Sequence, residues 1–361
     1  MRLLFLASAN VIHTRRWVTW FLERDHEVIL ATLEPSGEDC GPEEHVLPAR
    51  SSVQAFQYLL AVPALAGLVR KFRPQLVNAH FVSGYGFLAA LVPSARPLAI
   101  SAWGSDILLN PEKSRLHRFR TRFALRAARL VTCDAENLSG VLQGLGVESS
   151  RILEVPMGVD PRLFYPADKA VFLQTHGENP PLRIVSTRRL EPIYDIETLL
   201  RAAVILKSRG LDFQIEIAGQ GSIRPRLEKF TDECGLAKRV RFTGELSQAE
   251  LANILREADL YVSASHSDST SVSLLEAMAC GVFPVVTDIA GNRQWVEQGR
   301  NGLTFPPGDF YRLAECLAQA AEDRELRLKA RRANCELIRR KALWEENMRL
   351  VEEKFIELAG V

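Results

Sequence analysis

The sequence lacks an excess of charge of either sign. Lys and Arg together number 45 and Asp and Glu number 44, so the formal net charge of the 361 residues is only +1. Nucleic-acid-binding proteins attract phosphates through an overall basic field, which this chain does not have, although local basic patches remain open. We therefore expect no nucleic acid among its partners.

Closely spaced cysteines are also missing. The six cysteines stand at positions 40, 133, 234, 280, 316 and 335, and no two lie within five residues of each other. This spacing excludes CxxC pairs and predicts separate reduced thiols, as in a cytoplasmic protein. The sequence has no Walker A, HExxH or GxSxG motif either. These absences argue against a P-loop, a zinc protease site and an α/β-hydrolase nucleophile, and we expect no metal ion.

No apolar run is long enough to cross a membrane. The longest, 58–69, is interrupted by Pro63, whereas a membrane-spanning helix needs about 20 residues. The apolar start, 3–9, is too short for a signal peptide and fits a buried first strand. We therefore expect a cytoplasmic protein.

The first half of the chain contains short apolar runs that alternate with turns and helical segments. Strands are predicted at 3–8, 27–32, 75–79, 98–101 and 130–132, and a helix at 14–24. Near-continuous apolar strands that alternate with helices are typical of parallel sheets covered on both faces.

The alternation restarts after a proline-rich segment, 160–181. Strands are predicted at 183–187, 213–218, 240–243, 260–263 and 283–287, and helices at 195–209, 223–234, 248–257 and 271–279. The stretch 309–358 is helical in pattern almost throughout. The chain is therefore predicted to form two doubly wound α/β domains, 1–165 and 166–340, followed by a last segment at 341–361. Ligands of such sheets bind beyond the carboxyl ends of the strands.

The most informative segment follows the strand predicted at 260–263. The run 269–271 (Ser-Thr-Ser) offers hydroxyls and free N–H groups at the start of a helix, which suits a diphosphate. Asp268 precedes this run, and Glu276 lies on the second turn of the helix, so that one nucleotide sugar can touch both carboxylates. An N-cap loop followed by a helical carboxylate explains the same spacing without a ligand.

Two further signals lie at strand ends of the second half. Gly219 and Gly221 follow the strand 213–218 and permit a ligand to approach the backbone closely. Arg188 and Arg189 follow the strand 183–187 and can neutralise phosphates. A simple turn and a solvated arginine pair are the alternative interpretations.

A glycine-containing segment of the first half resembles a dinucleotide fingerprint. Gly84, Gly86 and Ala89 have a loose version of its spacing, and Asp106 lies 20 residues beyond Gly86. Such a fingerprint belongs after the first strand of a βαβ unit, whereas the first turn here, 10–14, has no glycine. The sequence thus argues against a nicotinamide site.

Taken together, these residues resemble the retaining glycosyltransferases of family 4, also called group 1, which have the GT-B fold of two facing Rossmann-like domains. That family carries two glutamates separated by seven residues, followed by Ala-Met-Ala, Gly and Pro-Val. Here Asp268 and Glu276 are followed by 277–279, Gly281 and 284–285. Further resembling segments are 73–80, 101–106, 158–166, 219–221, 241–244 and 301–309.

The sequence departs from the family pattern at four places. Asp268 replaces the first glutamate, Tyr194 a lysine, Trp103 a first-domain histidine, and 10–13 a Gly-Gly loop. These departures concern the expected sugar and phosphate contacts, whereas Glu276 and the glycine turn follow the family.

The resemblance implies transfer of a sugar from a nucleotide-diphosphate sugar, a UDP-sugar before a GDP-sugar, to an acceptor hydroxyl with retention. The acceptor would be a carbohydrate or lipid-linked molecule of cell-surface polysaccharide or glycolipid synthesis, and no cofactor is implied. The segment 341–361 would form a helix that packs back on the first domain. A nucleotide-sugar epimerase of the same fold and a non-catalytic nucleotide-sugar-binding protein are the alternatives.

The resemblance also assigns roles to individual residues. Glu276 would accept the ribose hydroxyls, Asp268 would hold the sugar, and Arg188 would face the diphosphate. Donor contacts are implied for Arg188, Arg189, Gly219, Gly221, Leu246, Asp268, Ser269, Thr270, Ser271 and Glu276. Catalysis is assigned to Asp268, Glu276, Arg188 and Asp106. Acceptor or sugar contacts fall to Asn10, His13, His80, Trp103 and Asp106, where a packed strand-end residue is the alternative for His80.

The segment 111–130 combines an apolar and a basic periodicity. One predicted helical face, packed on the first sheet, consists of Leu116, Phe119, Phe123, Ala127 and Leu130. A flanking stripe, about 100° around the helix, consists of Arg115, Arg118, Arg122, Arg126 and Arg129. The stripe is either a solvated edge or a docking surface for an anionic membrane or a phosphate-bearing lipid, on the inner face of the membrane. Because the apolar face is assigned to the fold, docking without insertion is expected.

Overall fold

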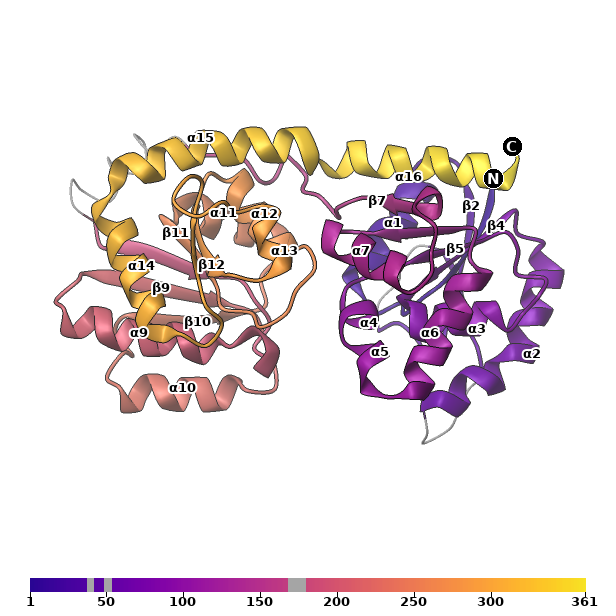
Figure 1. Ribbon diagram of the computed structural model, residues 1–361, viewed down its shortest axis with the longest axis horizontal. Helices are drawn as coiled ribbons and strands as arrows, with labels where there is room; N and C mark the ends of the chain where they lie inside the picture. Colours follow the sequence, from indigo (N-terminus) through magenta and orange to yellow (C-terminus); the bar gives the residue numbers. More distant parts are fainter. Residues whose placement is uncertain (38–41, 49–53, 168–179) are drawn as a thin grey trace. The chain divides into compact units, whose positions relative to one another are not determined.

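A computed structural model describes residues 1–37, 42–48, 54–167 and 180–361, which form two compact units (Figure 1). Unit 1 consists of Met1–Pro156 and Glu346–Val361, and unit 2 consists of Met157–Glu345. Contacts thus group residues 157–165, which the sequence analysis assigns to the first domain, with unit 2. Cys40 and residues 168–179 of the proline-rich segment lie outside the described residues.

Unit 1 is built on a seven-stranded parallel sheet in the order β3-β2-β1-β4-β5-β6-β7. Its strands are β1 (Arg2–Leu6), β2 (Glu27–Thr32), β3 (Glu43–Val46), β4 (Leu76–His80), β5 (Leu98–Ser101), β6 (Leu130–Cys133) and β7 (Ile152–Glu154). Its α-helices are α1 (Ile12–Leu22), α2 (Gln54–Phe72), α3 (Phe87–Ala90), α4 (Ser105–Leu108), α5 (Asn110–Lys113), α6 (Arg115–Ala127) and α7 (Glu136–Gly144). A π-helix, η1 (Phe81–Gly86), follows β4, and a 3₁₀-helix, η2 (Ser149–Arg151), precedes β7.

The central strands of unit 1 are apolar because helices cover both faces of their sheet. β1 pairs with β2 on one side and with β4 on the other, and the side chains of residues 3–6 are fully buried. The two strands that the sequence did not predict, β3 and β7, lie at the edges of the sheet. Their residues are exposed or only half-buried, so they carry no apolar run to detect.

The C-terminal helix α16 (Trp344–Ala359) packs with α1 through its unit 1 residues. The ring of Phe355 stacks on Phe21, with centroids 5.5 Å apart, and lies 6.3 Å from the ring of Trp17. The carboxylate of Glu352 accepts a hydrogen bond from Trp20 Nε1 at 2.9 Å and lies 2.8 Å from His26 Nε2. Residues far apart in the sequence therefore share one core.

Unit 2 is built on a six-stranded parallel sheet in the order β10-β9-β8-β11-β12-β13. Its strands are β8 (Leu182–Ser186), β9 (Phe213–Ala218), β10 (Val240–Gly244), β11 (Leu260–Ser263), β12 (Phe283–Thr287) and β13 (Leu303–Phe305). Its α-helices are α9 (Ile196–Ser208), α10 (Arg224–Glu233), α11 (Gln248–Glu257), α12 (Val272–Ala279), α13 (Ala290–Arg293), α14 (Phe310–Glu322) and α15 (Arg324–Lys341). A 3₁₀-helix, η3 (Pro192–Tyr194), precedes α9.

The five described cysteines carry free thiols. They are Cys133, Cys234, Cys280, Cys316 and Cys335, and four of the five are buried. None of the helices in the described ranges has both the length and the hydropathy needed to cross a bilayer.

The helix α6 buries a different face from the one predicted. Its buried residues are Arg120, Thr121, Ala124 and Leu125, whereas Leu116, Phe119 and Phe123 are exposed by 57%, 61% and 36%. The predicted apolar contact with the sheet is therefore wrong for these three residues. Polar partners explain the difference, because the Arg120 guanidinium donates to the Ser83 carbonyl and the Thr121 hydroxyl to the His117 carbonyl at 3.0 Å.

We predict that the packing of α16 is essential for the stability of unit 1. Phe355→Ala removes a fully buried ring that contacts two aromatic side chains of α1 and should lower the free energy of unfolding by about 3–5 kcal/mol. Urea unfolding monitored by tryptophan fluorescence measures this loss. Leu350→Ala on the same helix is the control, because Leu350 is 40% exposed. Equal losses in the two variants would contradict the packing role.

Candidate functional site

The predicted donor residues of unit 2 lie at one edge of its sheet. Arg188 follows β8, Gly219 and Gly221 follow β9, and the loop 264–271 follows β11. β9, β8 and β11 are neighbours in the sheet and run parallel, so their carboxyl ends meet at the same edge. The structure therefore brings together Arg188 and Ser271, which are 83 positions apart in the chain.

The buried side chain of Arg188 is the centre of this edge. One guanidinium nitrogen donates to the hydroxyls of Ser271 and, at 3.1 Å, of Ser273, while another forms an ion pair with Asp268. Burial by itself lowers the pKa of Arg188, but the neighbouring Asp268 carboxylate outweighs it, and the pKa is raised overall. The guanidinium thus stays charged.

Two of the four departures from the family pattern meet at Arg188. Asp268, which replaces a glutamate, is its ion-pair partner. Tyr194, which replaces a lysine, lies with its ring centroid 4.3 Å from the guanidinium carbon, a cation–π contact. The sequence placed each departure separately, and only the folded chain shows that both act on one cation.

The glycines after β9 are required by a close approach of two backbone segments. A Cβ atom at Gly219 would lie 2.5 Å from the Arg188 carbonyl oxygen, and one at Gly221 would lie 2.1 Å from the Leu190 carbonyl oxygen. The backbone N–H of Leu190 also donates to the Gln220 carbonyl at 2.9 Å. The glycine turn therefore fixes the backbone that carries Arg188, in addition to any approach by a ligand.

Buried side chains hold the start of α12. The Ser271 hydroxyl caps the helix by accepting the N–H of Leu274 at 3.3 Å. The Thr270 hydroxyl accepts hydrogen bonds from Gln294 Nε2 at 2.7 Å and Trp295 Nε1 at 3.3 Å, two residues that sequence reasoning missed. A helix N-terminus so fixed presents its dipole to an anion without rearrangement.

The remaining predicted donor residues differ in exposure. Glu276 is buried on α12, Ser269 is buried in the loop before it, and Leu246 is half-buried after β10. Arg189, by contrast, is exposed beside the buried Arg188. Ser273 and Tyr261, whose hydroxyls lie 2.9 Å apart, belong to the same network and were not predicted.

Unit 1 gathers a second set of predicted residues at the carboxyl ends of β4 and β5. The rings of His13 and Trp103 are stacked with centroids 5.4 Å apart, and Trp103 lies 5.2 Å from the ring of His80. Trp17 of α1 completes the cluster at 5.4 Å from His80.

Each of these four rings carries a buried nitrogen without a hydrogen-bond partner in the described chain. The atoms are His13 Nδ1, Trp17 Nε1, His80 Nε2 and Trp103 Nε1. A buried polar group without a hydrogen-bond partner destabilises the folded state by about 1–3 kcal/mol, and four such groups in one place are unusual. A ligand with hydroxyl groups would satisfy these nitrogens and lie against the aromatic faces.

Asp106 positions the loops around this cluster. Its carboxylate accepts the N–H of Val82 at 2.8 Å and the N–H of Trp103 at 3.1 Å, and its side chain is buried. Burial raises the pKa of Asp106 to about 6, against the opposing effect of these hydrogen bonds. Both oxygens thus hold backbone groups, which is the geometry of a positioning residue. Asn10 is exposed, and its side-chain amide donates to the Pro35 carbonyl at 3.2 Å.

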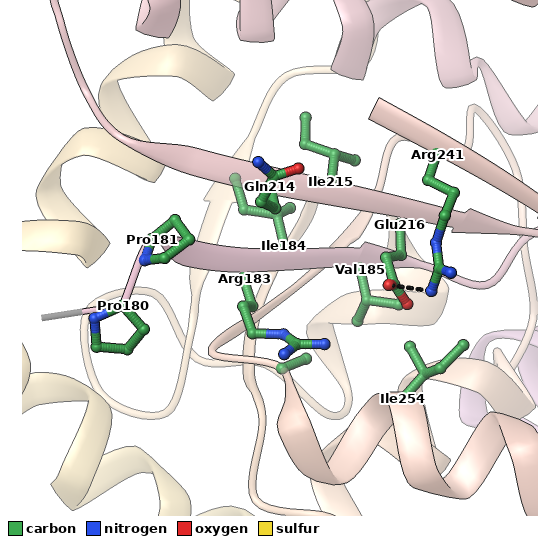
Figure 2. Close-up of a pocket in the computed structure, with 11 residues that line it drawn as sticks. Pro180, Pro181, Arg183, Ile184, Val185, Gln214, Ile215, Glu216, Arg241 and Ile254 are labelled. Carbon is green, nitrogen blue, oxygen red and sulfur yellow. Dashed lines mark hydrogen bonds and ion pairs between the residues drawn. The ribbon is translucent and has the colours of Figure 1, made fainter. Parts of the chain in front are cut away.

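Unit 2 also has a groove of about 270 Å³ (Figure 2). Its lining comes from the entry into β8, from the middle of β8 and β9, and from α11. Figure 2 shows Glu216 and Arg241 joined across neighbouring strands by an ion pair. None of the predicted donor residues lines this groove, so it does not extend the site.

The histidines of unit 1 predict a pH dependence of its stability. Burial lowers the pKa of His13 to about 4 and that of His80 to about 3, from 6.5. Their contribution to stability is complete above pH 6.5 and is lost as the pH falls towards 4 and 3. Asp106 acts in the opposite direction. Because its pKa is raised to about 6, its contribution to the stability of the folded state increases as the pH falls through 6. The loss from the two histidines exceeds the gain from the one carboxyl group. The free energy of unfolding should therefore fall by about 2 kcal/mol between pH 6.5 and 5.

Chemical denaturation at the two pH values measures this loss. The variant His80→Gln should retain less than half of the pH dependence, whatever its absolute stability. His45→Gln, a substitution at the half-buried edge strand β3, is the control and should keep the full dependence. A pH dependence that is unchanged in His80→Gln would refute the assignment.

Two family models match separate parts of the chain. The model described as "Glycosyl transferases group 1" matches residues 170–336, and "Glycosyl transferase 4-like" matches residues 2–135. Among curated relatives, D-inositol 3-phosphate glycosyltransferase of Paenarthrobacter aurescens is 29% identical over 223 residues, which are 60% of this chain and 55% of the relative. Alpha-D-kanosaminyltransferase of Streptomyces kanamyceticus is 29% identical over 161 residues, 45% of this chain and 42% of the relative. The chain thus spans about half the length of the curated relatives it matches.

Solved structures show the same fold over nearly the whole chain. Sucrose-phosphate synthase from Thermosynechococcus elongatus has a TM-score of 0.83 at 17% identity and covers 99% of both chains. Anabaena Alr3699/HepE in complex with UDP has a TM-score of 0.82 at 17% identity, over 99% of this chain and 100% of that one. From the two family matches and this fold, the chain belongs to the group 1, family 4-like glycosyltransferases of the GT-B fold.

Proposed function

We propose that this glycosyltransferase moves a hexose from a UDP-sugar to an acceptor hydroxyl with retention of the anomeric configuration. The observation that carries the donor half of this proposal is the charged, buried Arg188 at the strand-end edge of unit 2, beside the capped start of α12. Support for UDP comes from the neighbour Alr3699/HepE, whose structures hold UDP and UDP-glucose. GDP-sugars are the alternative donors.

The Arg188–Asp268 ion pair supplies a way for donor binding to prepare the site. In the chain without donor, Asp268 neutralises the guanidinium. A diphosphate that reaches this edge brings more negative charge than one carboxylate and competes for Arg188 and for the α12 N-terminus. Asp268 is then released to hold the hydroxyls of the sugar, and Glu276 holds the ribose.

In the chemical step, negative charge develops on the departing diphosphate, beside Arg188 and the start of α12. The bond between the anomeric carbon and the diphosphate oxygen breaks with its electron pair on the diphosphate, the acceptor oxygen bonds to that carbon, and the acceptor proton passes to the departing diphosphate. Arg188 and the helix N-terminus stabilise the departing UDP, because they are fixed before the reaction and need no reorganisation. No metal is assigned a role in this scheme.

We assign the acceptor to unit 1. The ring cluster of His13, Trp17, His80 and Trp103 offers aromatic faces with four buried nitrogens, which suits a carbohydrate or a polyol. The acceptor belongs to cell-surface polysaccharide or glycolipid synthesis in this proposal. The curated relatives include enzymes named for D-inositol 3-phosphate, whose phosphate and hydroxyls are compatible with such an acceptor site.

The outer face of α6 is proposed to dock on an anionic membrane. Its exposed apolar side chains, Leu116, Phe119 and Phe123, are accompanied by exposed arginines at 115, 118, 122, 126 and 129. The rings of Phe119 and Phe123 stack 6.1 Å apart and line a hollow of about 290 Å³ with four of these arginines. Exposed apolar groups between cations fit the boundary of lipid headgroups and acyl chains, so shallow insertion replaces the surface contact expected from the sequence.

The proposed reaction is tested by screening UDP- and GDP-sugars with the purified protein. A transferase releases UDP slowly even without acceptor, an epimerase isomerises the donor, and a binding protein does neither. Proton NMR of the transferred sugar then reports the anomeric configuration. Inversion would refute retention, and turnover with GDP-sugars alone would refute the choice of donor.

We predict that Glu276→Gln weakens UDP binding by about 10- to 150-fold, since a hydrogen bond to a charged group contributes roughly 1.5–3 kcal/mol. Isothermal titration calorimetry measures the affinity, and circular dichroism confirms the fold. Glu233→Gln, an exposed glutamate on α10, is the matched control and should bind UDP like the wild type. Unchanged affinity in Glu276→Gln would remove this residue from the site.

Membrane docking predicts dependence on both lipid charge and apolar side chains. Co-sedimentation with vesicles should need anionic lipid and decrease with added salt. Replacing Arg118, Arg122 and Arg126 by Ser should weaken binding about 100-fold, at roughly 1 kcal/mol for each arginine. The double variant Phe119→Ser and Phe123→Ser should also weaken it.

Three exposed arginines on α15 provide the control for lost charge. Replacing Arg324, Arg332 and Arg339 by Ser changes the net charge equally and should leave sedimentation unchanged. Equal sedimentation with neutral and anionic vesicles would rule out docking through α6.

A further inference from the structure

Unit 1 has a polar pocket that none of the sequence motifs predicted. Its volume is about 380 Å³, and its lining residues follow β1 (Ser8), β2 (Glu34) and β4 (the π-helix η1), with further residues from α2, α4, α5 and α6. The pocket thus lies at the carboxyl edge of the sheet, where parallel α/β sheets bind ligands. Its lining is rich in hydrogen-bonding side chains, including Tyr58, Ser105, Asn110 and His117.

Arg120 brings a buried positive charge to this pocket. Its side chain is only 7% exposed, although it lies on a helix whose other arginines are solvated. Its guanidinium carbon lies 5.1 Å from the ring centroid of Tyr58 and 4.9 Å from that of Phe87. The guanidinium donates to the Ser83 carbonyl, while its Nε has no hydrogen-bond partner within the described ranges.

No carboxylate of the described chain forms an ion pair with Arg120. Glu34, the acidic residue of the lining, is exposed, and no ion pair joins it to Arg120 within the described ranges. Arginine is seldom buried without a counter-ion, because the desolvation of an unpaired charge is costly. In unit 2, Asp268 provides this compensation for Arg188. Among the described residues, Arg120 has the Ser83 carbonyl and two aromatic faces as partners, so an anionic ligand would complete the compensation of its charge.

The backbone around the pocket is shaped for this arginine. Phe81 has φ +67°, a left-handed conformation that is strained for a non-glycine residue. Phe81 is the first residue of η1, and the Ser83 carbonyl in this helix accepts a hydrogen bond from the Arg120 guanidinium. A Cβ atom at Gly84 would lie 2.8 Å from the Tyr58 hydroxyl, so this glycine lets Tyr58 lie against η1.

We propose that this pocket binds a phosphate group of the acceptor, with Arg120 as its anchoring cation. The inference rests on the proposed glycosyl transfer and names the acceptor's class: a sugar, a polyol or a lipid headgroup that carries a phosphate ester. Several donors surround the cation, and a phosphate has the oxygens to bind Arg120, Tyr58 and Ser105 together. A carboxylate has one oxygen fewer to offer.

Matched acceptors that differ by one phosphate ester test the proposal. A polyol and its monophosphate, and a hexose and its 6-phosphate, are compared as acceptors, with inorganic phosphate as a direct probe in isothermal titration. The phosphorylated partner should have the lower KM, and inorganic phosphate should bind. In Arg120→Met the KM for the phosphate ester should rise about 10- to 150-fold, while the unphosphorylated partner is little affected.

Two further variants keep the test independent of folding. Ser105→Asp places a negative charge on an exposed residue of the pocket lining and should reduce phosphate binding even if Arg120→Met folds poorly. Arg70→Met, an exposed arginine at the end of α2, is the control for lost charge and should behave like the wild type. UDP affinity and acceptor-independent UDP release are measured in the wild type and in each variant. Their absence in the wild type would indicate failure of the proposed function, whereas their loss in a single variant would indicate that this variant does not fold.

The source of the phosphate is decided by the same assay. Transfer to water-soluble phosphate esters identifies a free metabolite, and transfer only to vesicles that contain a phosphoinositol headgroup identifies a lipid. Both results support the pocket assignment when they depend on Arg120. Equal use of unphosphorylated acceptors, preference for a sugar acid over the phosphate ester, or unchanged phosphate binding in both Arg120→Met and Ser105→Asp would overturn it.

Discussion

The need to compensate buried guanidinium groups governs both strand-end sites. Arg188 of unit 2 and Arg120 of unit 1 are almost fully removed from water, and each lies at the carboxyl edge of a parallel sheet. Asp268 balances Arg188 within the chain, and in the proposed function the donor diphosphate competes with this carboxylate. Arg120 has no such partner in the described chain, and its pocket therefore favours an anion. Charge thus connects the donor proposal with the acceptor proposal.

Backbone geometry holds both arginines in place. In unit 2, Gly219 and Gly221 admit the carbonyl oxygens of Arg188 and Leu190 at distances that a side chain would block. In unit 1, the left-handed Phe81 and the π-helix η1 direct the Ser83 carbonyl to Arg120, and the buried Asp106 carboxylate fixes the N–H of Val82 inside that helix. Rigid backbone of this kind keeps charged groups oriented before a ligand arrives.

The helix α6 has two faces of different character. Its inner face brings Arg120 to the polar pocket, and its outer face exposes Phe119 and Phe123 among arginines. If the outer face rests on a membrane, a phosphate-bearing headgroup and the pocket are separated by one helix. The acceptor site and the docking surface would then contact the same lipid layer, and this contact would account for the exposure of Phe119 and Phe123.

The sequence alone determined the alternation of strands and helices, with β2, β5, β9, β11 and β12 predicted at their observed bounds. It also placed Arg188 after a strand and Asp268 before a helix, because strand ends and helix starts are local patterns of polarity and glycine. The edge strands β3 and β7 were not predicted, because their exposed and half-buried residues form no apolar run in the sequence. Only the tertiary structure decided that Arg188 pairs with Asp268, that Arg120 is buried and that Phe119 is not. Hydrophobic periodicity cannot detect a buried polar side chain whose partners, such as the Ser83 carbonyl, come from another element of the fold.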